Sequence, residues 1–259
     1  MPRFRARRLL LVAAAALLLP ASVLAQTTDQ QPPKRTWMQR FLGIKPDLSG
    51  GWLFVGFKGD SRDGLYFAVS KDGSRWETIN FDRPVLWQEQ SGELMRDPFI
   101  QRAPDGSFRL VWTWSTDPAI IGYSTSTNLI YWSKQLELPV TQVLPAATSV
   151  CAPATYYDPE NKDWLLLFTA ADWSTRAAGD RTYVSTSPDF KHFQPARPFD
   201  PGQDVASATL LAQKQHASGS AAKITPPAGL QPGSLLHLET SEYDLLHNYH
   251  GGFDSAQTK

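Results

Sequence analysis

The sequence contains one cysteine, Cys151, among 259 residues, so no disulfide bond can form within the chain. It also lacks an excess of charge, because 25 Lys and Arg residues balance 25 Asp and Glu residues. A strongly basic surface for a nucleic-acid partner is therefore not expected. Stability must come from packing, and apolar residues, at 42% of the chain, are numerous enough to form a sizeable core.

Several catalytic motifs are absent from the sequence. There is no Gly-x-Ser-x-Gly serine hydrolase motif and no glycine-rich phosphate loop after a strand. His247 and His250 stand three residues apart without further ligands at metal-binding spacing, so neither a metal nor a cofactor is expected. Cys151 has apolar neighbours and no nearby histidine, which favours a buried small side chain over a catalytic thiol.

The only long apolar run lies at the N-terminus. A basic segment ending at Arg8 precedes the run Leu9–Leu19, and Val23-Leu24-Ala25 is typical of a cleavage site. The run is shorter than the roughly 20 residues of a membrane span and ends at Pro20. Residues 1–25 are therefore predicted to be a signal peptide, and the mature protein is expected to be periplasmic or secreted, without a membrane partner.

Residues 26–49 are polar and predict a linker, but from Gly50 onward apolar residues alternate at the period of a β-strand. Three strands of one type are predicted, each followed by a loop and a second strand. The first strands are expected at Trp52–Phe57, Phe108–Thr113 and Trp164–Thr169, and the second at Leu65–Ser70, Ile121–Ser126 and Thr182–Ser187.

An internal repeat follows each second strand. A serine is followed two residues later by Asp or Asn and four residues after that by an aromatic residue. Asp or Asn can close a tight turn through its side chain, while the ring covers the open end of the hairpin. We call these segments the turn boxes: Ser70/Asp72/Trp76, Ser126/Asn128/Trp132 and Ser187/Asp189/Phe193.

Repeated units of two strands and a turn box predict an all-β propeller, in which stacked blades bury their faces against one another. Three blades are expected, at residues 50–95, 96–148 and 149–202, with the first predicted strand of each innermost. A fourth blade opens at residues 204–211, so the propeller is assigned to residues 50–211. The glycine- and proline-containing segment 212–259 is predicted to be an irregular tail, which leaves the ring incomplete.

The segments Gly51–Asp60, Gly64–Gly73, Leu94-Met-Arg-Asp-Pro98 and Pro104–Thr113 resemble the five-bladed β-propellers of glycoside hydrolase family 43 and its arabinosidase and fructosidase relatives. The resemblance covers about residues 50–211. It implies hydrolysis with inversion by carboxylates around a central funnel, one acting as base, one as acid and a third orienting the substrate.

By resemblance, Asp97 matches the carboxylate of the family's Asp-Pro motif. It would act as the base, or as the transition-state stabiliser seen in fructan-cleaving relatives with Arg-Asp-Pro; an Asp-Pro turn with a local ion pair is the structural alternative. Two other family positions lack their acids, since Ala154 and Ser207 stand where carboxylates are expected. In the tail, Glu239, Glu242 and Asp244 are expected to be solvated loop charges.

Sugar-binding candidates are Arg96, Asp60 and the aromatic residues Trp114 and Phe57. Trp114 could stack on a sugar ring or pack between blades. Two functions remain open. The first is an exported hydrolase acting on arabinose-, xylose- or fructose-containing oligosaccharides, with reduced activity, and the second is a non-catalytic carbohydrate-binding or degenerate propeller.

Overall fold

The computed structural model describes residues 47–89, 93–174, 179–200 and 227–249. Within these ranges nearly all of the regular secondary structure is β-strand, as the alternating pattern predicts. The longer strands are β1 (Gly51–Phe57), β2 (Gly64–Ser70), β5 (Arg96–Arg102), β6 (Phe108–Ser115), β7 (Ile120–Ser126), β9 (Ala147–Asp158), β10 (Asp163–Asp172), β11 (Arg181–Ser187) and β13 (Gln231–Leu238). Short elements are β3 (Glu77–Thr78), η1 (Asn80–Asp82), β4 (Leu86–Trp87), β8 (Leu136–Pro139), η2 (Val140–Gln142), β12 (Arg197–Pro198) and the helix α3 (Thr240–His247).

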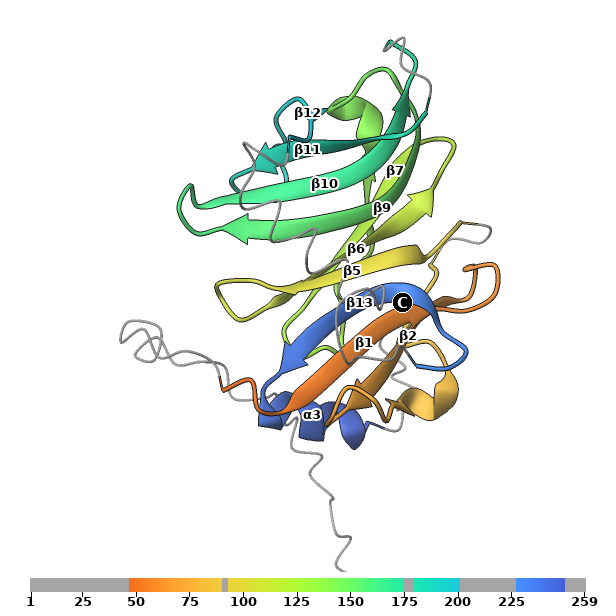
Figure 1. Cartoon of the computed structure of the whole chain (residues 1–259), viewed down its shortest axis with the longest axis vertical. Helices are drawn as coiled ribbons and strands as arrows, with labels where there is room; N and C mark the ends of the chain where they lie inside the picture. The colour runs from red at the N-terminus through yellow and green to blue at the C-terminus, as the bar shows by residue number, and fades with distance from the viewer. Residues whose placement is uncertain (1–46, 90–92, 175–178, 201–226, 250–259) are drawn as a thin grey trace, which may run out of the picture. The chain divides into compact units, whose positions relative to one another are not determined.

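These strands form three antiparallel sheets, each with a four-strand path (Figure 1). Blade 1 has the order β13-β1-β2-β3, with β4 also paired to β2; blade 2 is β5-β6-β7-β8, and blade 3 is β9-β10-β11-β12. The expected all-β propeller-type fold and the six predicted strands are confirmed. The predicted fourth blade, at residues 204–211, lies outside the described residues.

The inner strands of the blades differ from the prediction. Strand β5 packs against both β9 and β13, and Figure 1 shows these three strands running in the same direction. The predicted first strands correspond to β1, β6 and β10, which occupy the second position of each blade. That part of the prediction was wrong because β1, β6 and β10 carry the strongest apolar patterns, whereas prolines interrupt the patterns of β5, β9 and β13.

The tail also differs from the prediction, since residues 231–247 contain strand β13 and helix α3. Strand β13 pairs with β1 and supplies the inner strand of blade 1 from a distant part of the sequence. Glu242, expected to be a solvated charge, is only 5% exposed and makes a bidentate ion pair with Arg102 of β5. Its Oε2 also accepts the backbone N–H of Glu239, which completes a capping box for α3.

The turn boxes close hairpins as expected. In each box the Ser hydroxyl donates to the Asp or Asn side-chain oxygen, at 3.2 to 3.3 Å, and the same oxygen accepts two backbone N–H groups from the turn. Phe54 of β1 packs edge-on against Trp76 of the first box. The boxes are therefore architectural elements, and each one follows the third strand of its blade.

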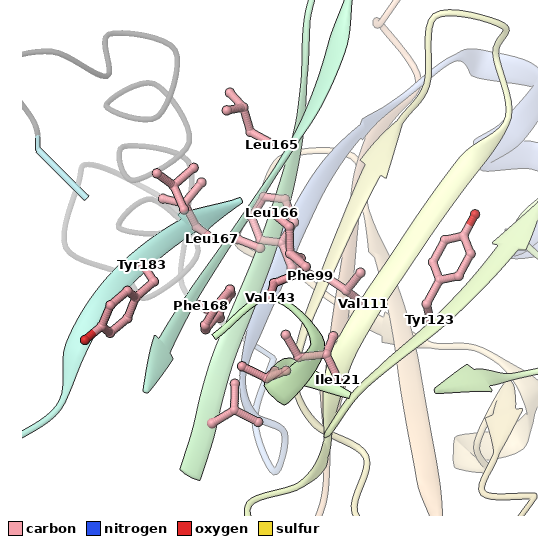
Figure 2. Close-up of a cluster of buried hydrophobic side chains, with 14 of the residues drawn as sticks. Phe99, Val111, Ile121, Tyr123, Val143, Leu165, Leu166, Leu167, Phe168 and Tyr183 are labelled. Atoms are coloured by element: carbon pink, nitrogen blue, oxygen red, sulfur yellow. The ribbon is translucent and has the colours of Figure 1, made fainter. Parts of the chain in front are cut away.

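Two apolar cores hold the blades together. One joins blades 1 and 2 and contains Trp112 and Trp114. The other joins blades 2 and 3, where Phe99, Val111 and Ile121 lie near the side chains of β10 (Figure 2). In this second core the Arg109 guanidinium lies 4.2 Å from the centroid of the Trp164 ring, a cation–π contact between the two blades. Packing between blades thus fixes the inner strands relative to one another.

The predicted signal peptide (residues 1–25) and nearly all of the predicted linker (residues 26–49) lie outside the described residues. Among the residues that are described, no helix is long and apolar enough to cross a membrane.

Candidate functional site

The three inner strands share one irregularity. Each has a bulge: between two paired positions the inner strand advances by three residues, whereas the neighbouring strand advances by two. The flanking pairs are Arg96↔Thr113 and Phe99↔Val111 in blade 2, Cys151↔Thr169 and Ala154↔Leu167 in blade 3, and Gln231↔Phe57 and Ser234↔Val55 in blade 1. By this register, Asp97 corresponds to Ala152 in blade 3 and to position 232, a proline, in blade 1.

The backbone at the bulge is the same in blades 2 and 3. Asp97 and Ala152 both have a φ of 51°, in the left-handed region that non-glycine residues rarely occupy, and each precedes a buried proline. The residues match in burial as well: Asp97 and Ala152 are partly exposed, while the residues two positions later, Phe99 and Ala154, are buried. A strained conformation that recurs in two blades marks this position as a candidate site.

The Asp97 carboxylate lies where blades 2 and 3 meet. Its Oδ2 accepts the Thr113 hydroxyl at 3.0 Å and the backbone N–H of Ala152 at 3.3 Å. The Arg96 Nε lies 3.6 Å from the same oxygen. Within the described part of the chain, no hydrogen bond reaches Oδ1, and the side chain is 31% exposed. One oxygen is thus held by protein donors while the other is available to accept a hydrogen bond from a ligand.

Two of the predicted binding residues lie in segments at the start of β5. Arg96 directly precedes Asp97 and is 37% exposed. Asp60 lies in the loop after β1, where it is exposed and its Oδ2 lies 3.4 Å from the Arg62 Nε. The backbone N–H of Met95 donates to the Ser61 carbonyl oxygen at 2.7 Å, so the loop that carries Asp60 lies next to the start of β5.

The predicted aromatic contacts belong to the core. Trp114 is 2% exposed and stacks on Trp112, with ring centroids 6.0 Å apart. A ring this buried offers no face to a sugar, so the structure supports packing between blades, one of the two alternatives for this residue. Phe57 is partly buried and packs against the same core.

Ala154 does not line the site. It is fully buried in the core between blades 2 and 3, and in register it corresponds to Phe99. A carboxylate at position 154 would face apolar side chains, whereas Ala152 corresponds to Asp97 and touches it. The structure thus places Ala154, where the resemblance implies a carboxylate, in the apolar core rather than beside Asp97. The acid expected at Ser207 lies outside the described residues.

The remaining carboxylates and histidines do not assemble a metal site. Across the described residues, no group of three or more His, Cys, Asp or Glu side chains could hold a metal ion. His247 lies 3.0 Å from a carboxylate oxygen of Glu77, away from Asp97 in the fold, and His250 is outside the described residues. Cys151 is partly exposed at the position in β9 that corresponds to Arg96.

Sequence reasoning missed Thr113 and the Ala152 N–H, the two groups that hold Asp97. A signal for them exists, because Asp97-Pro98 and Ala152-Pro153 precede β6 and β10 at similar distances. Aligning these two X-Pro pairs would have placed Ala152 at the position equivalent to Asp97.

Comparison with known proteins identifies the region that contains this site. Residues 47–225 match the model of a family described as a probable glycosyl hydrolase domain, related to glycoside hydrolase family 43. No curated protein matches the chain.

Similar solved structures include an α-L-arabinofuranosidase from Clostridium thermocellum, at 14% identity over 57% of this chain and 47% of that one, with a TM-score of 0.42. An endo-arabinanase from Bacillus licheniformis has 12% identity over 60% of this chain and 57% of that one, with a TM-score of 0.41. A fructan 1-exohydrolase from Cichorium intybus has 14% identity over 60% and 30% of the two chains, with a TM-score of 0.42. This chain thus spans less than two thirds of each of these proteins.

Proposed function

From the membership of this chain in the family of probable glycosyl hydrolase domains related to glycoside hydrolase family 43, we propose that it is an exported protein that binds arabinose-, xylose- or fructose-containing oligosaccharides at Asp97 and cleaves them slowly. The observation that carries the proposal is the arrangement of the Asp97 carboxylate, with Oδ2 held by Thr113 and the Ala152 N–H and with Oδ1 available. The names of the similar structures, which include an arabinanase and a fructan exohydrolase, support this class of ligand.

The geometry suits an acceptor of sugar hydroxyl groups or of a water proton. A carboxylate that is ionised at neutral pH can accept a hydrogen bond from a water molecule and draw its proton away as the water attacks an anomeric carbon. The donors on Oδ2 fix the orientation of the carboxylate, so Oδ1 points in one direction without reorganisation. Asp97 is accordingly assigned the role of base or transition-state stabiliser, and Arg96 and Asp60 are proposed to bind sugar hydroxyls.

Slow cleavage is proposed because the equivalent bulge positions of the described inner strands carry no acid partner for Asp97. Hydrolysis with inversion needs a second carboxyl group, about 6.5–9.5 Å from the first, to protonate the leaving oxygen. The positions that correspond to Asp97 are Ala152 and Pro232, neither of which can transfer a proton. Loss of general acid catalysis typically costs about 10²- to 10⁴-fold in rate. Binding through hydrogen bonds does not require that acid.

The proposal is tested by titrating the purified protein with arabino-, xylo- and fructo-oligosaccharides in a calorimeter and by assaying hydrolysis of the matching aryl glycosides. We expect binding, slow turnover, and a roughly ten- to hundredfold loss of affinity in Asp97→Asn, since a charged acceptor becomes neutral. Asp105→Asn is the matched control, because Asp105 is an exposed turn residue beyond the other end of β5. Binding that is unchanged in Asp97→Asn, or no binding of any of these sugars, would overturn the proposal.

A further inference from the structure

The hairpin of β9 and β10 is longer than its counterpart in blade 2. Strands β9 and β10 have 12 and 10 residues, whereas β5 and β6 have 7 and 8. Strand β5 begins at Arg96, the position that corresponds to Cys151, but β9 begins at Ala147 and still pairs with β10 there. Because β5 and β9 run in the same direction (Figure 1) and touch at Asp97, the extra length of blade 3 projects beyond the start of β5, where Asp97 is the second residue.

Trp173 stands at the far end of this extension. Trp173 is 75% exposed, more than any other large apolar residue in the described part of the chain. Its backbone N–H donates to the Ala146 carbonyl oxygen at 3.2 Å, which continues the pairing of the hairpin by one step. The backbone of Trp173 is therefore held in place by strand pairing, while its large apolar ring is exposed to solvent.

The residues on either side of Trp173 fix its backbone further. The Asp172 Oδ1 accepts the backbone N–H of Ser174 at 2.8 Å and its hydroxyl at 2.6 Å, which forms a closed turn. The Asp172 Oδ2 accepts the Tyr183 hydroxyl from the neighbouring strand β11 at 3.1 Å. An exposed tryptophan on an ordered turn loses little conformational entropy when a flat ligand covers it, and this is the property of a stacking platform.

The separation between Trp173 and Asp97 determines what kind of ligand can reach both. Trp173 pairs with residue 146, six residues before Ala152, which touches Asp97. At about 3.3 Å per strand residue, the two sites are roughly 20 Å apart along β9. One sugar ring cannot span that distance, but an extended oligosaccharide can.

We propose that Trp173 stacks on a sugar ring of a bound oligosaccharide at a position remote from the unit at Asp97, so that the protein selects long chains over mono- and disaccharides. This inference depends on the proposed function, because it requires a carbohydrate at Asp97. The β9–β10 extension then acts as one wall of an elongated binding surface, with recognition by hydrogen bonds at one end and by an aromatic ring at the other.

The experiment measures the affinity of the full chain and of Trp173→Ala for a ladder of arabino-, xylo- and fructo-oligosaccharides from one to eight units. We expect Trp173→Ala to lose roughly three- to tenfold in affinity for the long members, the size of a single aromatic contact, with no change for the short ones. Trp173→Phe should restore much of the loss because it keeps a ring. Trp87→Ala is the matched control, since Trp87 is 52% exposed on β4 of blade 1.

The outcomes separate this inference from the function on which it rests. If long and short sugars bind to the unmodified protein and Asp97→Asn weakens both, but Trp173→Ala changes neither or changes both equally, the remote site is wrong and the proposed function stands. If Asp97→Asn changes nothing, or no sugar binds, both are overturned. Trp173→Ala is not expected to affect folding, because its side chain is solvent-exposed, and an unchanged thermal transition confirms this.

Discussion

Blades 2 and 3 have the same backbone and different chemistry at one position. Asp97 and Ala152 share a φ of 51°, a following proline and a place in equivalent bulges, yet one bears a carboxylate and the other a methyl group. The two positions also depend on each other, because the N–H of Ala152 donates to the carboxylate of Asp97. The bulge is therefore a structural feature that the blades share. A carboxylate at the bulge position is specific to blade 2 among the described inner strands.

The inner strand of blade 1 extends the comparison. It has the same bulge, but it comes from the other end of the chain, and Arg102 of β5 holds it and α3 together by donating to the His237 carbonyl oxygen of β13 at 3.0 Å and pairing with Glu242 of α3. The Ser234 Oγ on β13 also accepts the backbone N–H of Ile100 at 2.9 Å. Strand β13 is thus held beside β5 by side-chain contacts between segments far apart in the sequence, in addition to its pairing with β1.

The largest expected effect comes from breaking that ion pair. Glu242→Ala leaves the mostly buried Arg102 guanidinium without its carboxylate and removes half of the α3 capping box, so we expect the free energy of unfolding to fall by about 3–5 kcal/mol. Denaturant unfolding measures the change. The control is Asp244→Ala, which removes an exposed charge from the same helix. A loss below about 1 kcal/mol in Glu242→Ala would show that the ion pair contributes little to the stability of the fold.

A smaller effect is expected from the equivalent threonines of blades 2 and 3, Thr113 and Thr169, because only Thr113 contacts a carboxylate. Thr113 is fully buried, donates to Asp97 and accepts the Ala152 N–H at 3.2 Å, so Thr113→Val should lower the free energy of unfolding by about 1–3 kcal/mol and weaken sugar binding. Thr169 holds the equivalent register position in blade 3, beside a bulge without a carboxylate. Thr169→Val should therefore change neither quantity. Equal effects of the two substitutions would contradict the functional difference between the blades.

The smallest effect concerns the turn boxes, where blades 1 and 3 have Asp and blade 2 has Asn. The pKa values of Asp72 and Asp189 lie below the usual range for Asp. The main cause is a hydrogen bond that each carboxylate accepts from a backbone N–H group, that of Arg75 for Asp72 and that of His192 for Asp189. A depressed pKa in the folded state contributes stability that is present above the unfolded pKa of about 3.9 and is lost as pH falls through the folded value. Asn128 makes the same contacts without titrating.

We therefore expect the double variant Asp72→Asn and Asp189→Asn to be close to the unmodified protein in stability at pH 7 and to lose less stability on going from pH 5 to pH 2. Urea unfolding across this range measures the slope. The reverse change, Asn128→Asp, should make the slope steeper. Parallel slopes for all three proteins would show that the boxes do not contribute to acid unfolding.

Local patterns determined much of this molecule from the sequence. The strands β1, β2, β6, β7, β10 and β11 follow from alternating apolar residues, and the turn boxes follow from the ability of Asp and Asn to accept neighbouring N–H groups. Asp97 could be singled out by its Arg-Asp-Pro motif. These features depend on residues close together in the chain, so the sequence alone carries them.

Only the tertiary structure decided which strands are innermost, where the tail lies and which residue faces Asp97. Strand β13 was not predictable because its partner, β1, is about 180 residues away and a polar segment with prolines gives no local sign of such pairing. The contact of Ala152 with Asp97 was not predicted, because a bulge sets the register there, and the bulge arises from pairing between strands rather than from either strand alone. Burial of Trp114 and Glu242 likewise depends on the blade next to each, which a one-dimensional pattern does not contain.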